Sequence, residues 1–141
     1  IEVVDYTAPQ LPEDKVRYLM GVGKPNDIIE AVYRGVDIFD CVIPTREGRH
    51  GIAYVGSSSI NIKNSKFESD LTPLDEGSDY FVSKKYSKSY LNHLLKIKDP
   101  LGPMLISLHN LNYYFNLMTN LRTCIEEGRL DNFREVFYKD N

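Results

Sequence analysis

The 141-residue sequence contains no tryptophan, only two cysteines, and no apolar run long enough to cross a bilayer. Cys41 and Cys124 stand apart in the sequence, so neither a disulfide framework nor a Cys-x-x-Cys metal site is indicated. The sequence also shows no signal-peptide pattern. These absences argue against a disulfide-stabilised secreted domain and against a membrane protein, and we expect a cytoplasmic protein that makes no membrane contact.

The composition, 42% hydrophobic and 26% charged, predicts one globular domain with a real core. The net charge of −3 is unevenly distributed: −4 over residues 1–44, +3 over residues 45–98 and −2 over residues 99–141. The middle third is therefore the best place for a polyanion to bind. An ordinary solvated surface would give a similar excess, so charge alone does not indicate a nucleic-acid-binding protein.

The first third of the sequence alternates strand and helix signals. Two prolines make residues 1–16 read as a connector, and residues 17–22 form a short apolar run that predicts a buried strand. A helix follows from Pro25 to Gly35, with Asp27 as its expected cap and Glu30 as the reciprocal capping partner. Its expected buried side consists of Ile28, Ile29, Ala31 and Val32. Residues 36–43 predict a second strand. This order predicts a βαβ unit with a parallel strand pair.

The remaining sequence predicts a hairpin and then helices. Residues 51–62 read as a β-hairpin with a Gly-Ser-Ser-Ser turn, and Ser83 is the expected cap of a helix that runs to about residue 96. The longest helix is expected over residues 105–127, with a buried stripe formed by Leu108, Leu111, Phe115, Met118, Leu121, Arg122 and Ile125.

The stretch DIFDCVIPTREGR at residues 37–49 organises the chain. It begins as an apolar strand and turns into a polar, basic segment that we expect to be a loop. Asp40 interrupts the apolar run, and a carboxylate there costs free energy unless it is solvated, paired or hydrogen-bonded. The residues alone allow two interpretations: a structural aspartate satisfied by backbone amides, or a reactive carboxylate at a strand end.

Several blocks of the sequence, in order and at matching spacing, resemble the tRNA-guanine transglycosylase (queuine tRNA-ribosyltransferase) family. They are RYLMGVG at 17–23, GVDIFDCVIPTR at 35–46, GR at 48–49, INIKN at 60–64, PLD at 73–75, SKSYL at 87–91, LHN at 108–110 and EGR at 127–129. The resemblance covers nearly the whole sequence and corresponds to the C-terminal portion of a family member.

The resemblance implies the C-terminal part of an α/β, (β/α)8 TIM-type barrel with an inserted hairpin and helical subdomain. Residues 1–44 would then hold the last two barrel strands, residues 45–103 the inserted subdomain, and residues 104–141 the C-terminal helices. A complete barrel needs about 250 residues, so this sequence cannot close one by itself.

The resemblance also implies the chemistry. Asp40 matches the nucleophile that attacks C1′ of the wobble guanosine in a tRNA with a GUN-type anticodon. Guanine leaves, and queuine or a 7-deazaguanine precursor then attacks the ribosyl ester, so that two inversions give retention. Asp37 lies three residues earlier, on the opposite strand face, and is expected to be structural.

Other site residues follow from the same match. Tyr18, Met20 and Gly21 correspond to residues that line the base pocket, and Arg46 and Arg49 to residues near the RNA backbone. Judged without the family, core packing would be the simpler interpretation of Tyr18 and Met20. We expect the RNA contact to extend over five lysines: Lys63, Lys66, Lys84, Lys85 and Lys88.

The sequence departs from the family at a structural zinc site, which is usually a Cys-x-Cys-x-x-Cys cluster followed by a distant histidine. Here Ser78, Tyr80 and Ser83 occupy the cysteine positions, and only His109 is retained. We therefore expect no stoichiometric zinc and no other cofactor.

Two functions stay open on the sequence. One is the C-terminal part of a transglycosylase, active only together with an N-terminal barrel portion; the other is a catalytically incomplete relative that acts as an RNA-binding or dimerisation module. The family also implies a homodimer or a partner subunit.

Overall fold

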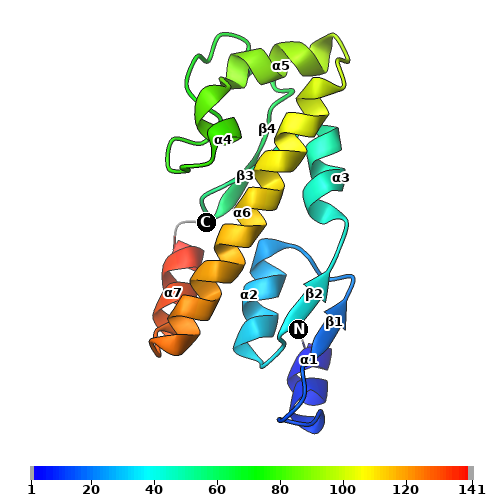
Figure 1. Cartoon of the computed structure of the whole chain (residues 1–141), viewed down its shortest axis with the longest axis vertical. Coiled ribbons are helices and arrows are strands. Elements are labelled where there is room, and N and C mark those ends of the chain that lie inside the picture. Colours follow the sequence, from blue (N-terminus) through cyan, green and yellow to red (C-terminus); the bar gives the residue numbers. More distant parts are fainter. Residues whose placement is uncertain (1, 140–141) are drawn as a thin grey trace. The chain divides into compact units, whose positions relative to one another are not determined.

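The computed structural model describes residues 2–139, which fall into two compact units (Figure 1). The strand-pair unit consists of residues 2–43 together with Leu117–Lys139, and the hairpin unit consists of residues 44–116. The long helix α6 (Leu101–Glu126) contributes to both. The structure is mixed α/β and rich in helix, whereas the barrel, the inserted subdomain and the three-part division of the chain stay predictions.

The strand-pair unit contains the predicted βαβ motif. Strand β1 (Tyr18–Met20), helix α2 (Pro25–Tyr33) and strand β2 (Ile38–Asp40) follow one another, and the strands pair in parallel. The register places Tyr18 beside Ile38 and Met20 beside Asp40. Both strands are shorter than expected, and their end residues are exposed rather than buried.

The N-terminal segment corrects one expectation, because residues 2–7 form a helix rather than a connector. Helix α1 (Glu2–Thr7) ends just before the 3-10 turn η1 (Ala8–Gln10), which contains Pro9. A proline is unfavourable in a helix interior and disfavours helix at the residue before it, but here the helix is complete before Pro9. Pro9 therefore lies just beyond the end of this helix and does not prevent the helix from forming.

Helix α2 supplies the apolar core of the strand-pair unit. Its buried side chains include Ile28, Ile29, Ala31 and Val32, as predicted. The expected cap is wrong: Lys24 holds the N-cap position without a side-chain bond, and Asp27 lies inside the first turn. In that position its negative charge interacts favourably with the positive end of the helix dipole, but its side chain does not cap a backbone amide.

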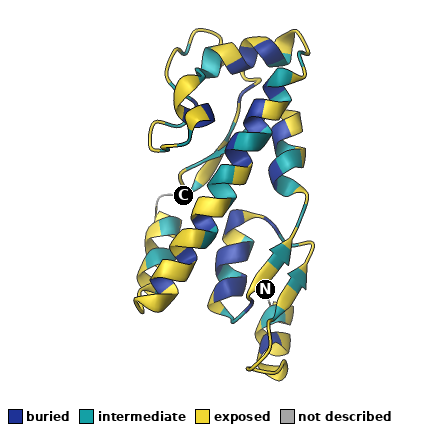
Figure 2. Ribbon diagram, in the orientation of Figure 1, coloured by how far each residue is buried: buried dark blue, intermediate teal, exposed yellow. Residues whose placement is uncertain are grey.

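Helix α7 (Leu130–Lys139) has no buried residue (Figure 2). Charged side chains attach it to α2. Arg134 donates from Nε and Nη2 to the two carboxylate oxygens of Glu30, at 2.5 and 3.1 Å. Arg34 also donates to Glu30, at 2.5 Å, and the Arg134 guanidinium lies over the Tyr33 ring. Glu30 is thus the centre of an ion-pair cluster. The sequence pattern predicts only a capping role for it.

The hairpin unit contains the predicted antiparallel hairpin, β3 (Ile52–Val55) with β4 (Ser58–Asn61). Around it lie α3 (Ile43–His50), the 3-10 turn η2 (Ser65–Phe67), α4 (Phe81–Lys85), α5 (Lys88–Lys96) and the first part of α6. Their buried side chains form one cluster: Ala53, Ile62, Phe67, Leu74, Val82, Leu91, Leu94, Leu105 and Ile106. The hairpin therefore has a core of its own to pack on.

Two local expectations in this unit are wrong. Residues 44–49 form helix α3 instead of a loop, because Pro44 at the second helical position needs no amide hydrogen there. The helix expected from Ser83 to residue 96 is split into α4 and α5, and Ser87 caps α5 by accepting a hydrogen bond from the Tyr90 amide at 3.1 Å. Ser83 is fully buried instead.

Helix α6 begins earlier than predicted and buries a different face. Asp99 accepts a hydrogen bond from the Leu101 amide at 2.8 Å, and Pro103 is accommodated in the first turn. Of the predicted stripe only Leu121 is buried, whereas Phe115 is 73% exposed. The buried residues of α6 are Gly102, Leu105, Ile106, His109, Asn110, Leu117, Leu121 and Cys124. No helix within residues 2–139 has the length and hydropathy required to cross a membrane.

Candidate active site

Asp40 lies at the end of β2, where two groups from the neighbouring β1 segment hold its carboxylate. The Tyr18 hydroxyl donates to Asp40 Oδ1 at 2.7 Å, and the Gly21 amide donates to the same oxygen at 3.1 Å. Gly21 has a φ of +76°, a conformation that glycine adopts at little cost, and its amide also reaches the Asp40 carbonyl. We call this arrangement the Asp40 clamp.

The clamp favours the ionised carboxylate. The hydrogen bond from Tyr18, followed by that from the Gly21 amide, holds the pKa of Asp40 below its usual value. The same hydrogen bond raises the pKa of Tyr18, because its proton is shared with a negative group. Asp40 is also exposed to solvent, so desolvation raises its pKa less than the two hydrogen bonds lower it.

The two oxygens of Asp40 are not equivalent. Both hydrogen bonds that other described residues donate to this side chain fall on Oδ1. Oδ2 is therefore the oxygen available for an external electrophile. This geometry combines a fixed, ionised carboxylate with one open oxygen, as nucleophilic attack requires.

Tyr18 and Met20 share one face of β1, and both are exposed, Met20 by 75%. The register brings Met20 beside Asp40, so this face carries an aromatic ring, a thioether and the carboxylate together. The sequence had assigned Tyr18 to a base pocket without a contact to Asp40. That hydrogen bond depends on strand register, and nothing in the sequence specifies the register.

Cys41 and Asp37 have packing and structural positions beside the clamp. A Cβ added at the buried Gly23 would lie 1.8 Å from the Cys41 sulfur, so only glycine fits there. Asp37 accepts a hydrogen bond from the Arg17 amide at 2.8 Å, which agrees with the structural role expected for it. Both carboxylates are exposed, but Asp37 is held by one backbone amide, whereas Asp40 receives a side-chain hydroxyl and a backbone amide on the same oxygen.

Arg46 and Arg49 belong to the hairpin unit, three residues apart on α3, and both are exposed. Neither guanidinium has a carboxylate partner among residues 2–139. Gly48 lies between them against Ser107 of α6, and a Cβ there would approach the Ser107 Cα to 2.7 Å. Close packing of α3 on α6 therefore fixes the helix that presents both arginines.

Three of the five predicted lysines already have partners within the chain. Lys84 is bonded to Asp79, Lys88 lies 3.9 Å from Asp70, and Lys66 lies over the ring of Phe67. Lys63 and Lys85 have no ion pair in the described part of the chain. Arg46 and Arg49 thus share their exposure and lack of an ion pair with Lys63 and Lys85, but only the two arginines lie one turn apart on one helix.

His109 is buried, and both of its ring nitrogens have partners within the hairpin unit. Nδ1 lies 2.8 Å from the Ser83 hydroxyl, and Nε2 lies 2.7 Å from the Tyr54 carbonyl. Burial lowers the pKa of His109. Across residues 2–139, no group of three or more histidine, cysteine, aspartate or glutamate side chains is arranged to hold a metal ion.

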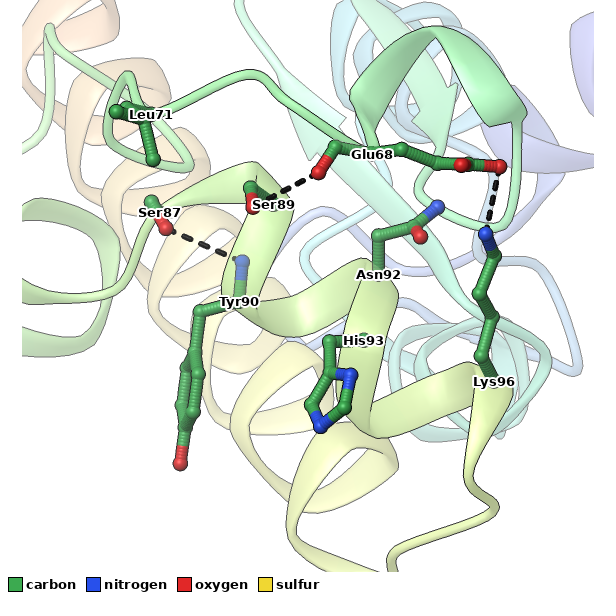
Figure 3. Close-up of a pocket in the computed structure, with 8 residues that line it drawn as sticks. All are labelled: Glu68, Leu71, Ser87, Ser89, Tyr90, Asn92, His93 and Lys96. Carbon is green, nitrogen blue, oxygen red and sulfur yellow. Dashed lines mark hydrogen bonds and ion pairs between the residues drawn. The ribbon is translucent and has the colours of Figure 1, made fainter.

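A surface recess beside α5 contains further polar groups, but they are already used locally (Figure 3). Lys96 pairs with Glu68 at 2.6 Å, and Ser89 donates to the Glu68 carbonyl at 3.0 Å. Ser87 is occupied as the cap of α5. These contacts account for Glu68, Ser87, Ser89 and Lys96 as helix capping and surface pairing, and we assign the recess no chemistry.

Comparison with known proteins identifies relatives over the whole sequence. The family model described as queuine tRNA-ribosyltransferase matches residues 1–141. Queuine tRNA-ribosyltransferases of Francisella tularensis subsp. tularensis (strain WY96-3418) and subsp. novicida (strain U112) are each 51% identical over 137 residues, and that of subsp. mediasiatica (strain FSC147) is 50% identical. Each alignment covers 97% of this chain and 37% of the relative.

Proposed function

Because the chain belongs to the queuine tRNA-ribosyltransferase family, we propose that it forms the C-terminal part of a tRNA-guanine transglycosylase and carries the nucleophile, Asp40. The observation that supports this most directly is the Asp40 clamp, which keeps the carboxylate ionised and one oxygen open. An intact clamp favours the enzyme over a catalytically incomplete binding module.

The proposed reaction has two displacements at the ribose C1′ of a wobble guanosine. In the first, Asp40 Oδ2 forms a bond to C1′ while the C1′–N9 bond breaks, and the leaving guanine takes up a proton on N9. In the second, the ring nitrogen of queuine or a 7-deazaguanine precursor attacks C1′ and loses its proton. The C1′–Oδ2 bond then breaks and returns an ionised aspartate.

The clamp contributes to both displacements. Before attack, the hydrogen bonds to Oδ1 orient the carboxylate so that it loses little rotational freedom in the transition state. When the ester breaks, the same donors stabilise the negative charge that returns to the carboxylate. Tyr18 thereby acquires a proposed role on the nucleophile in addition to lining the base pocket with Met20 and Gly21.

The proposed RNA contact uses Arg46 and Arg49. Two guanidinium groups one helical turn apart can each bind a phosphate of the anticodon loop without reading base identity. Their exposure and lack of carboxylate partners in the described residues support this role. The substrates are then a tRNA with a GUN-type anticodon and a deazaguanine, in the cytoplasm, in an enzyme that is a homodimer or has a partner subunit.

A chimeric enzyme tests the proposal. The 141 residues would replace the corresponding portion of the Francisella tularensis relative, to which they are 51% identical. We expect exchange of labelled guanine into tRNA, and a covalent protein–tRNA band on a denaturing gel. Asp40→Asn keeps the shape of the side chain but removes the nucleophilic charge, so both signals should disappear.

Asp37→Asn is the matched control, because that carboxylate binds a backbone amide and has no proposed role in the displacement. It should retain the covalent band. A band that persists in Asp40→Asn, or a well-folded chimera without any exchange, would contradict the proposed function.

A further inference from the structure

His109 joins three elements of the hairpin unit through side-chain hydrogen bonds. It projects from α6, contacts the Tyr54 carbonyl on β3 and contacts the Ser83 hydroxyl on α4. His109 is 1% exposed and Ser83 is 0% exposed, so neither group can exchange its partner for water. Buried polar groups of this kind destabilise a fold unless every one is hydrogen-bonded.

The partners determine the direction of each hydrogen bond. A carbonyl oxygen can only accept, so Nε2 of His109 carries the ring hydrogen and donates to Tyr54. Nδ1 of a neutral ring is then an acceptor, and the Ser83 hydroxyl donates to it. The lowered pKa of His109 agrees with a neutral ring. The lone pair with which this imidazole could bind a metal is therefore engaged by Ser83.

Asn110, the next residue on α6, also attaches strand β3 to this helix. Asn110 accepts from the Tyr54 amide at 3.0 Å and donates to the Ile52 and Pro44 carbonyls, each at 2.9 Å. Among the residues that the structure describes, strand β3 has one strand partner, β4. The side chains of His109 and Asn110 satisfy backbone groups of Tyr54 and Ile52 in place of a second strand. The hairpin is thus bound to α6 by side chains.

The donor set at this centre does not fit zinc. Structural zinc sites take thiolates and imidazoles, four in number, whereas Ser83 offers a hydroxyl that is already donating. Ser78 accepts a hydrogen bond from the Tyr80 amide at 3.2 Å, and the Tyr80 ring packs on the hydrophobic core and on Phe81. None of the three positions supplies a thiolate.

We propose that the hydrogen-bonded chain Tyr54–His109–Ser83 replaces the structural zinc that the family resemblance implies, so that the hairpin unit folds without a metal. The link between hairpin, α4 and α6 is retained, but it is made by protein groups alone. This inference rests on the buried contacts and does not depend on the transfer reaction proposed above.

Metal content and chelation test the first half of the proposal. The full chain is expressed with added zinc, purified and measured by elemental analysis, and its thermal unfolding is followed with and without a strong zinc chelator. We expect no stoichiometric zinc and an unchanged unfolding midpoint. One tightly bound zinc per chain, or a midpoint that falls with chelator, would overturn the proposal.

A serine pair tests the second half. Ser83→Ala removes the donor to Nδ1 and leaves a buried ring nitrogen unpaired, so we expect the unfolding midpoint to fall by about 4 °C. Ser59→Ala, on an exposed position of β4, should leave the midpoint unchanged. Equal midpoints for the two variants would show that the Ser83 contact stabilises nothing.

NMR of the wild-type chain provides a measurement that does not require the variant to fold. The ¹⁵N shifts of the His109 ring should show an unprotonated, accepting Nδ1 and a hydrogen on Nε2 that exchanges slowly with solvent. A hydrogen on Nδ1, a ring that titrates like a free imidazole, or shifts of a metal-bound ring would each contradict the proposed chain.

Discussion

The Tyr18 hydroxyl donates a 2.7 Å hydrogen bond to Asp40 Oδ1 across the parallel strand pair β1–β2. The two residues are 22 positions apart in the sequence and come together only because the strands pair in this register. Tyr18, expected from the family resemblance to line a base pocket, is thereby also a hydrogen-bond donor to the carboxylate. Its contribution can be separated from ring stacking by removing the hydroxyl alone.

Tyr18→Phe should slow base exchange in the chimeric enzyme without abolishing it. The ring remains to line the pocket, so KM for tRNA should change little, whereas kcat should fall by about tenfold with the loss of one donor to the carboxylate. Tyr6→Phe, at a side chain that is 76% exposed, is the control. An unchanged kcat would remove Tyr18 from any role on Asp40.

The pH dependence of the same variant gives a second, independent readout. The Tyr18 hydrogen bond keeps the pKa of Asp40 below its usual value, so its loss should raise that pKa. Asp40 would then become protonated at a higher pH, and the acid limb of kcat/KM should move upward in Tyr18→Phe. A downward movement of that limb would be incompatible with the clamp.

The parallel pair and the buried side of α2 could be predicted from sequence because both depend on local apolar patterns. Ile28, Ile29 and Val32 recur at helical spacing, and burial of that face is enough to place the helix. The contacts within the candidate site could not be predicted in this way. Asp40 could be singled out as a polar residue in an apolar run, but its bond to Tyr18 follows from register, which a local pattern does not contain.

The predicted stripe on α6 failed for a physical reason that concerns His109 and Asn110. A hydropathy pattern places such residues outside, yet here tertiary hydrogen bonds to β3 satisfy them, and they occupy the buried face. Rotating the helix to bury them turns Phe115 outward, where it is 73% exposed. Long-range hydrogen bonds therefore determine which face of α6 is buried. The hydropathy pattern of a single helix contains no information about such bonds.

Arg46 and Arg49 should contribute to tRNA affinity through charge alone. Replacing either with glutamine should weaken binding for all tRNA sequences alike, and should reduce the slope of log K against log salt by about 0.7 to 0.9 for each lost phosphate contact. Arg129→Gln is a suitable control, because that guanidinium is already bonded to Glu127. Unchanged salt slopes in both variants would mean that α3 does not contact the RNA backbone.

Glu30 should make the attachment of α7 sensitive to acid. Burial alone raises the pKa of Glu30, but hydrogen bonds from Arg134, Arg34 and Tyr138 outweigh it and lower the pKa to about 2, from an ordinary value of 4.5. Because the folded pKa is the lower one, the stabilisation is complete above pH 4.5 and is lost as the pH falls toward 2.

Glu30→Gln should therefore lower the free energy of unfolding by about 2 kcal/mol at neutral pH, and should flatten its decline on acidification. Urea denaturation across this pH range measures both effects. Glu135→Gln is the control: its pair with Lys139 is exposed and 3.7 Å long, and should be worth less than about 0.5 kcal/mol. Equal stabilities of the two variants at neutral pH would exclude the proposed cluster as an anchor for α7.

The 141-residue chain by itself should be inactive in base exchange and should associate. Each strand of the β1–β2 pair has one strand partner among the described residues, and the pair exposes Tyr18, Met20 and Ile38. Unpaired strand edges that carry exposed apolar side chains pair readily with other chains. Light scattering should therefore show dimers or larger species, and exchange assays should give only background.

Charge placed on this face should oppose that association. Ile38→Lys puts a cation on a side chain that is 50% exposed, so the fold loses little apolar burial while strand-to-strand contact between chains becomes unfavourable. Leu71→Lys, in the hairpin unit at a side chain that is 80% exposed, adds the same charge elsewhere and should not change the scattering. Association that falls equally in both variants would point to net charge, and a monomeric wild type with measurable exchange would show that the strand pair needs no further strands to build a working site.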